Sequence, residues 1–183
     1  CLFRRPHIKT MSVLLNLFLD ICLFRKGPQD TPSSMALLKI CLAAYGLTSL
    51  LALLIGTPAL VALLQTLLDM ALLSGLLYVA LILYRRPRRF EQTLSALTGS
   101  GALISLLALP LLFWITQQPP GGDTELPALL LLALMAWSIA IMAHILRHAL
   151  NAPIWIGALY ALGYTLLSWQ LTGWIGSFDS QGY

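Results

Sequence analysis

Five long apolar runs, separated by short polar connections, make up most of this 183-residue chain. A helix of about 20 apolar residues is long enough to cross the ~30 Å hydrocarbon core of a bilayer. With 58% hydrophobic and only 10% charged residues, the chain lacks the polar residues that a soluble bundle of such helices would need on its surface. We therefore predict an all-α, polytopic membrane bundle of five transmembrane helices, over residues 34–55, 58–84, 93–116, 127–146 and 154–175.

The positive charges of the chain are distributed asymmetrically over these spans. All eleven Lys and Arg residues lie on one side of a five-pass topology, ten of them in the N-terminal segment or the inner loops and Lys39 in the first turns of the first span. Loops rich in Lys and Arg stay in the cytoplasm. The pattern predicts a membrane protein whose N-terminus lies in the cytoplasm and whose C-terminus lies on the opposite side of the membrane. Its net charge of +4 then reflects contacts with anionic lipid headgroups rather than with nucleic acid.

The segment before the first span contains an apolar stretch, residues 13–24, that is too short to cross a membrane. Ser12, Asn16 and Asp20 recur every fourth residue, so they form a narrow polar stripe on a helix that is otherwise apolar. This pattern predicts an amphipathic helix that lies in the cytoplasmic interface or packs against the bundle. The expected organisation is a cytoplasmic segment (1–33), a five-helix transmembrane domain (34–176) and a short outer tail (177–183). The start-like Met11 makes residues 1–10 a dispensable extension in this interpretation.

Asp69 is the only acidic residue within a predicted span, and it lies about midway along residues 58–84. An ionised carboxylate at that depth is unfavourable by several kcal/mol unless it is paired or hydrated. Gln65 lies one turn away on the same helix face, and counting depth at ~1.5 Å per residue brings hydroxyl groups of the other spans to the same level. These hydroxyl residues are Tyr45, Ser105, Ser138, Tyr164 and Thr165.

Two interpretations of this candidate intramembrane polar site stay open. In the functional interpretation, Asp69 is a proton or cation site or a polar contact for a partner helix. In the structural interpretation, it is a protonated acid that hydrogen-bonds across the bundle. Only Pro110 interrupts a span, and no second intramembrane acid is present, which weakens the case for a transport pathway.

Four arginines, Arg85, Arg86, Arg88 and Arg89, surround a proline in the inner loop between the second and third spans. They are candidate contacts for lipid headgroups, and such a run more often anchors the topology than binds a specific phosphate.

No group of residues in the chain has the spacing of a catalytic or metal site. Cys1, Cys22 and Cys41 lack metal-ligand spacing, and His144 and His148 are four residues apart with no nearby acid or cysteine. Because neither a Ser/His pair nor paired acids are visible, we expect no enzyme activity, no cofactor and no metal.

Small residues recur at four-residue spacing in two of the spans. Ser95 and Gly99, Gly101 and Ser105, and Gly157 and Ala161 all follow this pattern, which is typical of close helix packing in membranes. It predicts a bundle with the third and fifth spans near its centre.

The order of parts resembles that of the Yip1 superfamily of small five-span membrane proteins. The inner loop 85–90, which leads into residues 91–97, is similar to the corresponding passage of bacterial members, and residues 27–30 resemble an uncharacterised proteobacterial group. The vesicle-trafficking motifs of eukaryotic members are absent, so the resemblance implies no Rab-type partner. It implies a non-enzymatic membrane protein that acts through protein or lipid contacts. Because the similar members are bacterial, it also implies a location in the bacterial inner membrane, with the C-terminus in the periplasm.

The expected function is therefore that of a membrane scaffold or accessory protein. Its expected partners are the lipid bilayer and either another membrane protein or further copies of the chain. The alternative is a small transporter or channel component that uses Asp69.

Overall fold

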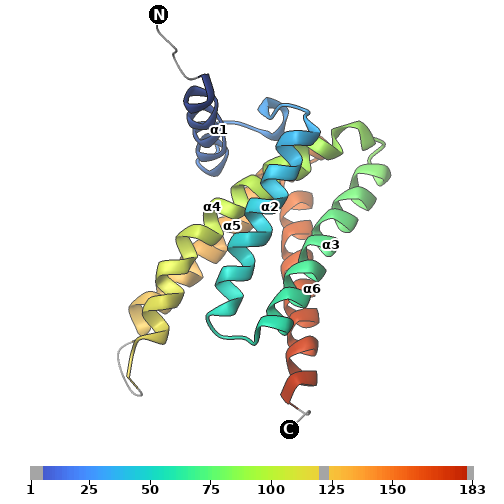
Figure 1. Cartoon of the computed structure of the whole chain (residues 1–183). Helices are drawn as coiled ribbons and strands as arrows, with labels where there is room; N and C mark the ends of the chain where they lie inside the picture. The colour runs from blue at the N-terminus through green and yellow to red at the C-terminus, as the bar shows by residue number, and fades with distance from the viewer. Residues whose placement is uncertain (1–5, 120–123, 181–183) are drawn as a thin grey trace, which may run out of the picture.

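In residues 6–119 and 124–180, the parts of the chain that this computed structural model describes, there are six α-helices, two short 3-10 helices and no strand (Figure 1). The elements are α1 (Pro6–Cys22), η1 (Pro28–Asp30), α2 (Met35–Leu54), α3 (Ala59–Leu83), η2 (Pro87–Arg89), α4 (Phe90–Thr116), α5 (Glu125–Leu150) and α6 (Ile154–Ser180). The predicted all-α class is confirmed.

Within the described residues, four segments are long and apolar enough to cross a membrane: Met35–Leu54, Ala59–Leu83, Pro87–Thr116 and Glu125–Leu150. They match the first four predicted spans, and they give the chain the apolar helices of a membrane-embedded protein. The fifth predicted span lies in α6, which does not belong to this set. Glycines, tyrosines, hydroxyl residues and Gln170 make α6 less hydrophobic than the other four.

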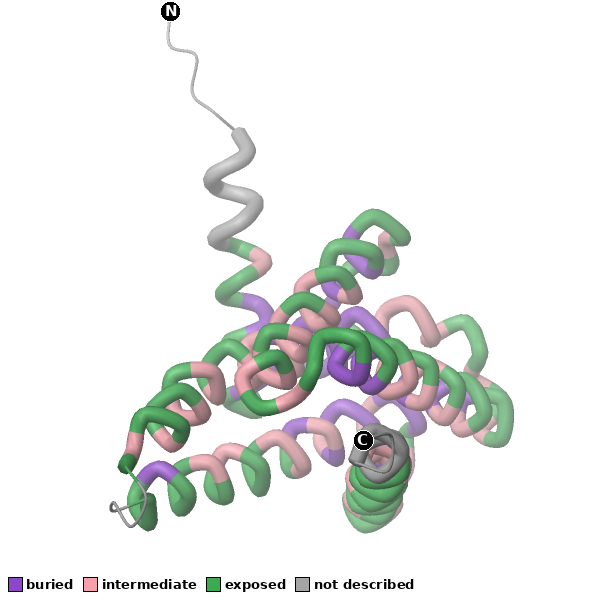
Figure 2. Tube along the Cα trace, turned by 60° about the horizontal axis from the view of Figure 1, so that its bottom comes forward, coloured by how far each residue is buried: buried purple, intermediate pink, exposed green. Residues whose placement is uncertain are grey.

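The long helices alternate in direction, so the bundle has two distinct ends (Figure 1). The end with α1 and with the α3–α4 and α5–α6 connections is called the inner end here. The opposite end, with the α2–α3 connection and the C-terminal end of α6, is the outer end. Towards the outer end, α4 and α5 run together away from α3 and α6, and most of their residues there are exposed (Figure 2).

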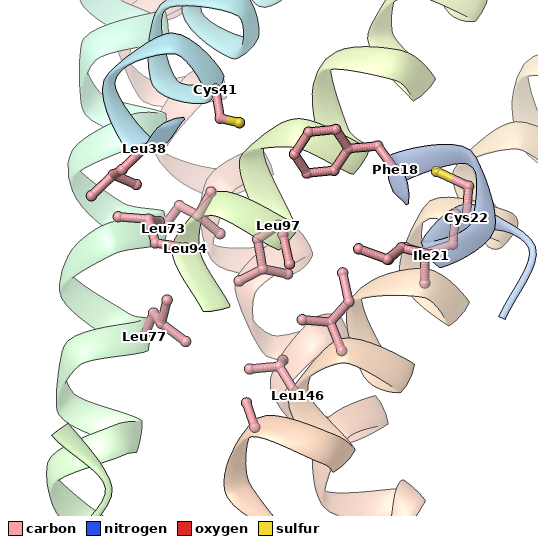
Figure 3. Close-up of a cluster of buried hydrophobic side chains, with 14 of the residues drawn as sticks. Phe18, Ile21, Cys22, Leu38, Cys41, Leu73, Leu77, Leu94, Leu97 and Leu146 are labelled. Carbon is pink, nitrogen blue, oxygen red and sulfur yellow. The ribbon is translucent and has the colours of Figure 1, made fainter. Parts of the chain in front are cut away.

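The apolar core of the molecule lies at the inner end, where α1 packs against α4 and α5. Phe18, Ile21 and Cys22 of α1 approach the inner turns of the long helices (Figure 3). The long helices contribute Leu38 and Cys41 from α2, Leu73 and Leu77 from α3, Leu94 and Leu97 from α4, and Leu146 from α5. Helix α1 is therefore part of the protein core. Of the two predicted arrangements, it adopts the one in which it packs against the bundle.

Gly99 allows α1 to pack closely against α4. A β-carbon added at Gly99 would overlap the ring of Phe18, so only a glycine leaves room for this side chain. Every residue of α4 from Thr93 to Ser100 is buried, because this half of the helix packs against α1, α2 and α5. The predicted small-residue pattern of the third span thus has a specific use, which is to admit an aromatic side chain from α1.

The structure corrects the predicted bounds of the N-terminal helix. Helix α1 begins at Pro6 and ends at Cys22, whereas residues 13–24 were predicted. It stops because Phe24 adopts a left-handed backbone conformation (φ 60°), and the N–H groups of Arg25 and Lys26 then donate to the carbonyl oxygen of Asp20. The Lys26 ammonium also lies 2.9 Å from the Asp20 carboxylate, which further fixes this turn.

Two other expectations about the bundle change. Helix α4 is central as predicted, but α6 lies at the edge and, among its described side chains, buries only Gly157, Ala161 and Tyr164. Gly157 lies directly against the backbone carbonyl of Ala143 on α5, which brings these two helices close together. Part of the predicted outer tail is helical, because α6 continues to Ser180; residues 181–183 lie outside the described part of the chain.

Candidate functional site

Asp69, on α3, accepts hydrogen bonds from three hydroxyl groups on two other helices. Tyr45 of α2 donates to Oδ2 at 2.6 Å, and Tyr164 and Ser168 of α6 donate to Oδ1 at 2.6 and 2.7 Å. One carboxyl group therefore links α2, α3 and α6.

The positions of these hydroxyl groups follow from local helix geometry. Tyr164 and Ser168 are four residues apart, so both project from the same face of α6 towards the same oxygen. The ring of Tyr45 packs over Gly101 of α4, where an added β-carbon would lie only 2.9 Å from the ring. The glycine thus provides the space that lets the Tyr45 hydroxyl reach Asp69.

The hydrogen-bond geometry makes the Asp69 carboxyl group an acceptor from all three partners. Each partner has an O–H donor to offer, and distances of 2.6–2.7 Å are those of short O–H···O hydrogen bonds. A carboxylate offers about four acceptor positions, two on each oxygen. In the described part of the chain, Oδ1 accepts two hydrogen bonds and Oδ2 accepts one, so one acceptor position on Oδ2 is left for a further donor.

Asp69 is only partly buried, because a cavity of about 380 Å³ lies beside it. All five long helices contribute to its wall, and five of the six predicted site residues line it: Tyr45, Asp69, Ser105, Ser138 and Tyr164. The structure therefore brings these residues together around one space, although Ser138 donates its hydrogen to the carbonyl of Met135 on its own helix instead of to Asp69.

Several cavity hydroxyl groups direct their hydrogens away from the cavity. Ser100 donates to the carbonyl oxygen of Ala96 and Thr165 donates to that of Ala161, each within its own helix. Together with Ser138 and the three donors to Asp69, these groups offer mainly oxygen lone pairs to a ligand. The polar part of the cavity is therefore rich in acceptors.

Gln65, the sixth predicted residue, lies beside a second cavity of about 240 Å³ that shares Asp69 and Ser105 with the first. Its amide nitrogen donates to the carbonyl oxygen of Thr172 at 3.1 Å. Its Oε1 is buried and has no protein partner in the described residues. Gln65 therefore adds one unused acceptor next to Asp69.

The four predicted headgroup arginines lie at the inner end, away from this site. Arg89 is held by the bundle, because it donates to the carbonyl oxygens of His148 and Ala149 (3.0 and 3.4 Å) at the end of α5. Arg85 and Arg88 are exposed and Arg86 is half-buried, so these three remain available to headgroups. Arg89 has a structural use that its position in an arginine run did not reveal.

The described residues contain no group of three His, Cys, Asp or Glu side chains that could hold a metal ion. The predicted histidine pair packs edge to face, with 4.7 Å between the ring centroids of His144 and His148, and a ring nitrogen of His144 lies 3.3 Å from the carbonyl oxygen of Lys26. Cys22 and Cys41 are free thiols within the apolar core, whereas Cys1 lies outside the described residues.

Ser168 is the principal site residue that the sequence interpretation missed. It lies one turn beyond the predicted midplane residues of α6, so a search restricted to that depth passed over it. Its spacing of four residues from Tyr164 was the available signal, because two hydroxyl groups on one helix face can share an acceptor.

Comparison of the chain with known proteins identifies no relative. No protein-family model matches the chain, and neither a curated protein nor a solved structure is significantly similar to it. The resemblance to the Yip1 superfamily stays a prediction, and the function must be argued from the site itself.

Proposed function

We propose that the chain is a five-span membrane protein of the bacterial inner membrane with its N-terminus in the cytoplasm. Helix α6 supports the fifth span, because it is 27 residues long, carries no charged residue before Asp179 and packs along α5 and α3. The basic residues support the orientation, because α1 and the arginine-rich loop lie at the same end of the bundle (Figure 1).

Reporter fusions test this topology. A reporter placed after Phe90 is expected to be cytoplasmic, and reporters after Gly122 or at Tyr183 are expected to be periplasmic. A cytoplasmic reporter at Tyr183 would remove α6 from the set of spans.

For the activity, we propose that the protein binds a cation or a proton at Asp69 as a small transporter or channel component, without catalysing a reaction. The observation that supports this proposal is a carboxyl group that accepts three hydrogen bonds and lies beside a cavity of about 380 Å³. Ionisable groups within a membrane usually mark ion or substrate pathways, and ligand sites are usually preformed concave pockets. An acid that served only to link helices would need no such space beside it.

The distribution of apolar residues also favours a binding site over a static contact. Leu73, Leu97 and Ile141 line the inner side of the cavity, and all three belong to the buried apolar core. The cavity beside Asp69 therefore ends against an apolar layer at the inner end. A solute site backed by a closed barrier is the arrangement expected for one state of an alternating-access protein.

The decisive experiment replaces the carboxylate while keeping its size. Asp69→Asn retains an acceptor and a similar shape but cannot carry a charge, so it is expected to abolish complementation of a deletion phenotype while the protein still folds. Glu91→Gln is the matched control, because it removes one acid from the first turn of α4, outside the cavity. Full complementation by Asp69→Asn would refute the proposal.

The scaffold or accessory function is a second candidate, and the exposed face of α1 favours it. Val13, Leu15 and Leu19 remain exposed while the opposite face of α1 packs on the bundle. Such a face can lie in the lipid interface or contact another membrane protein. Leu15→Gln and Leu19→Gln together are expected to reduce membrane retention of a soluble reporter fused to residues 1–33, or to release a partner from a mild-detergent pull-down. If neither changes, this candidate fails.

A further inference from the structure

We infer that the Asp69 cavity binds a protonated amine that carries an apolar body, which names the ligand class for the function proposed above and rests on it. The inference follows from the charge, the hydrogen-bonding capacity and the size of the cavity.

The charge of the cavity selects a cation. Asp69 is the only charged residue in its lining. Six of the hydroxyl groups in the lining already donate, three to Asp69 and three to carbonyl oxygens within their own helices. The hydroxyl groups of Ser105 and Thr172 and the indole N–H of Trp169 are further donors in the lining. A ligand therefore meets more acceptors than donors around one acidic side chain, which favours a cation with N–H donors over an anion.

The hydrogen-bonding capacity distinguishes an amine from a quaternary ammonium group. One acceptor position on Asp69 Oδ2 is unused in the described structure, and it can receive one N–H. The carbonyl oxygen of Gln65, one helical turn away, is a second unused acceptor, and it lies beside the second cavity, which shares Asp69 with the first. A buried acceptor without a partner is unfavourable, so a bridging water is expected there.

The size and walls of the cavity favour an organic cation over an inorganic ion. A volume of about 380 Å³ lies within the range of small-molecule sites and far exceeds that of a single ion. Its lining includes the apolar side chains of Ile104, Met135 and Met142, and also Trp169. These side chains suit an aliphatic or aromatic body, and an indole face attracts a cation.

Phenethylammonium is a suitable probe, because it joins a primary ammonium group to an apolar ring. We expect it to raise the thermal unfolding temperature of the full-length protein in nanodiscs, and to change tryptophan fluorescence, in a saturable manner. Its neutral isostere 2-phenylethanol is expected to have no saturable effect, and the N,N,N-trimethyl analogue is expected to bind at least about tenfold more weakly because it has no N–H donor. Equal effects of the alcohol and the amine would overturn the inference, as would equal effects of sodium ions and the amine.

Two pairs of variants locate the binding. Ser105→Leu fills the cavity without removing a donor to Asp69, and it is expected to weaken phenethylammonium binding by at least about tenfold. Ser74→Leu is its control, because Ser74 bonds to its own helix outside the cavity lining. Asp69→Asn should also weaken binding at least tenfold, whereas Glu91→Gln should not. Amine binding that survives both Ser105→Leu and Asp69→Asn would place the ligand elsewhere and end the inference.

The outcomes also separate this inference from the proposed function. If Asp69→Asn abolishes complementation but no amine binds the native protein, the function at Asp69 stands and the amine inference fails. If amines bind in an Asp69-dependent way but Asp69→Asn complements fully, the ligand site stands and the transport function fails.

Discussion

The inner and outer halves of the bundle use similar apolar helices for different purposes. At the inner end, α1 fits against α4 and α5, and the side chains between them are buried in a dry core. Towards the outer end, α4 and α5 separate from α3 and α6 (Figure 1). A cavity of about 380 Å³ lies beside Asp69. The comparison predicts that stability is concentrated in the half that contains α1, whereas the other half holds the cavity and the hydrogen bonds to Asp69.

Helix α4 shows the contrast within one element. All its residues from Thr93 to Ser100 are buried by protein, whereas Leu106 and Leu107 in its second half are both 54% exposed. Leucines in the two halves have the same hydrophobicity, but those of the second half face the positions that lipid would occupy. Apolar composition alone therefore does not distinguish protein core from lipid-facing surface.

Truncation of a core leucine should give the largest difference between the halves. Leu77 is completely buried at the inner end, and Leu77→Ala is expected to lower the free energy of unfolding by about 2–5 kcal/mol through the cavity it leaves. Leu107→Ala, at an exposed position of the outer half, should change it by about 0.5 kcal/mol or less. Unfolding by denaturing detergent measures both, and equal losses would contradict the comparison.

Addition of one methyl group at Gly99 should be the next most damaging change. Gly99→Ala places a carbon within the ring of Phe18, so we expect a loss of about 1–3 kcal/mol and displacement of α1. Phe18→Ala in the same chain should recover part of this loss, because it removes the overlap. Gly75→Ala is the control, since an added carbon there meets nothing within 4 Å. If Gly99→Ala and Gly75→Ala are equally tolerated, α1 is not held in the way described.

Substitution of Asp69 tests the outer half, where hydrogen bonds between helices supplement apolar packing. Asp69→Leu removes three interhelical hydrogen bonds and is expected to lower stability by about 1–2 kcal/mol, which is less than the loss of a core leucine. Asp69→Asn should be nearer to the native protein because it retains an acceptor. Thermal unfolding in nanodiscs ranks the three proteins. A loss for Asp69→Leu as large as that for Leu77→Ala would make Asp69 a main stabilising element instead of a local site.

Labelling of the Cys22 thiol probes the inner end chemically, and of these tests it is expected to affect stability least. Burial raises the pKa of the Cys22 thiol from 9.0 to about 11, because a thiolate loses its hydration there. Below pH 9 the thiolate fraction is thus about a hundredfold lower than that of an ordinary cysteine, and labelling by a maleimide should rise with pH up to about 11.

Phe18→Ala should make Cys22 more reactive if it loosens α1, because the thiol is then hydrated and its pKa falls towards 9.0. The measurement needs a chain with Cys1 and Cys41 replaced by serine, so that a single thiol reports. Fast labelling of Cys22 at pH 7 without Phe18→Ala would show that α1 is not packed as described.

The lengths of the apolar runs were sufficient to predict the helical class and four of the membrane-compatible helices, because a bilayer requires long, uncharged helices. They were also sufficient to single out Asp69, because a mid-span acid is rare. Depth counting then placed Tyr45 and Tyr164 at the correct level, and both bond to it. These predictions depend only on helix rise and hydrophobicity, which are properties of each segment alone.

Other features were decided only by the tertiary structure. The edge position of α6, the contact of Phe18 with Gly99 and the use of Arg89 to bond the end of α5 all depend on which helix faces meet. The bond from Ser168 likewise depends on which face of α6 meets α3, and the cavity beside Asp69 depends on how all five long helices surround it. In a uniformly apolar helix every face can contact either lipid or protein. The fit of side chains between helices therefore decides which faces pair. This fit cannot be predicted from the hydrophobicity of a single segment.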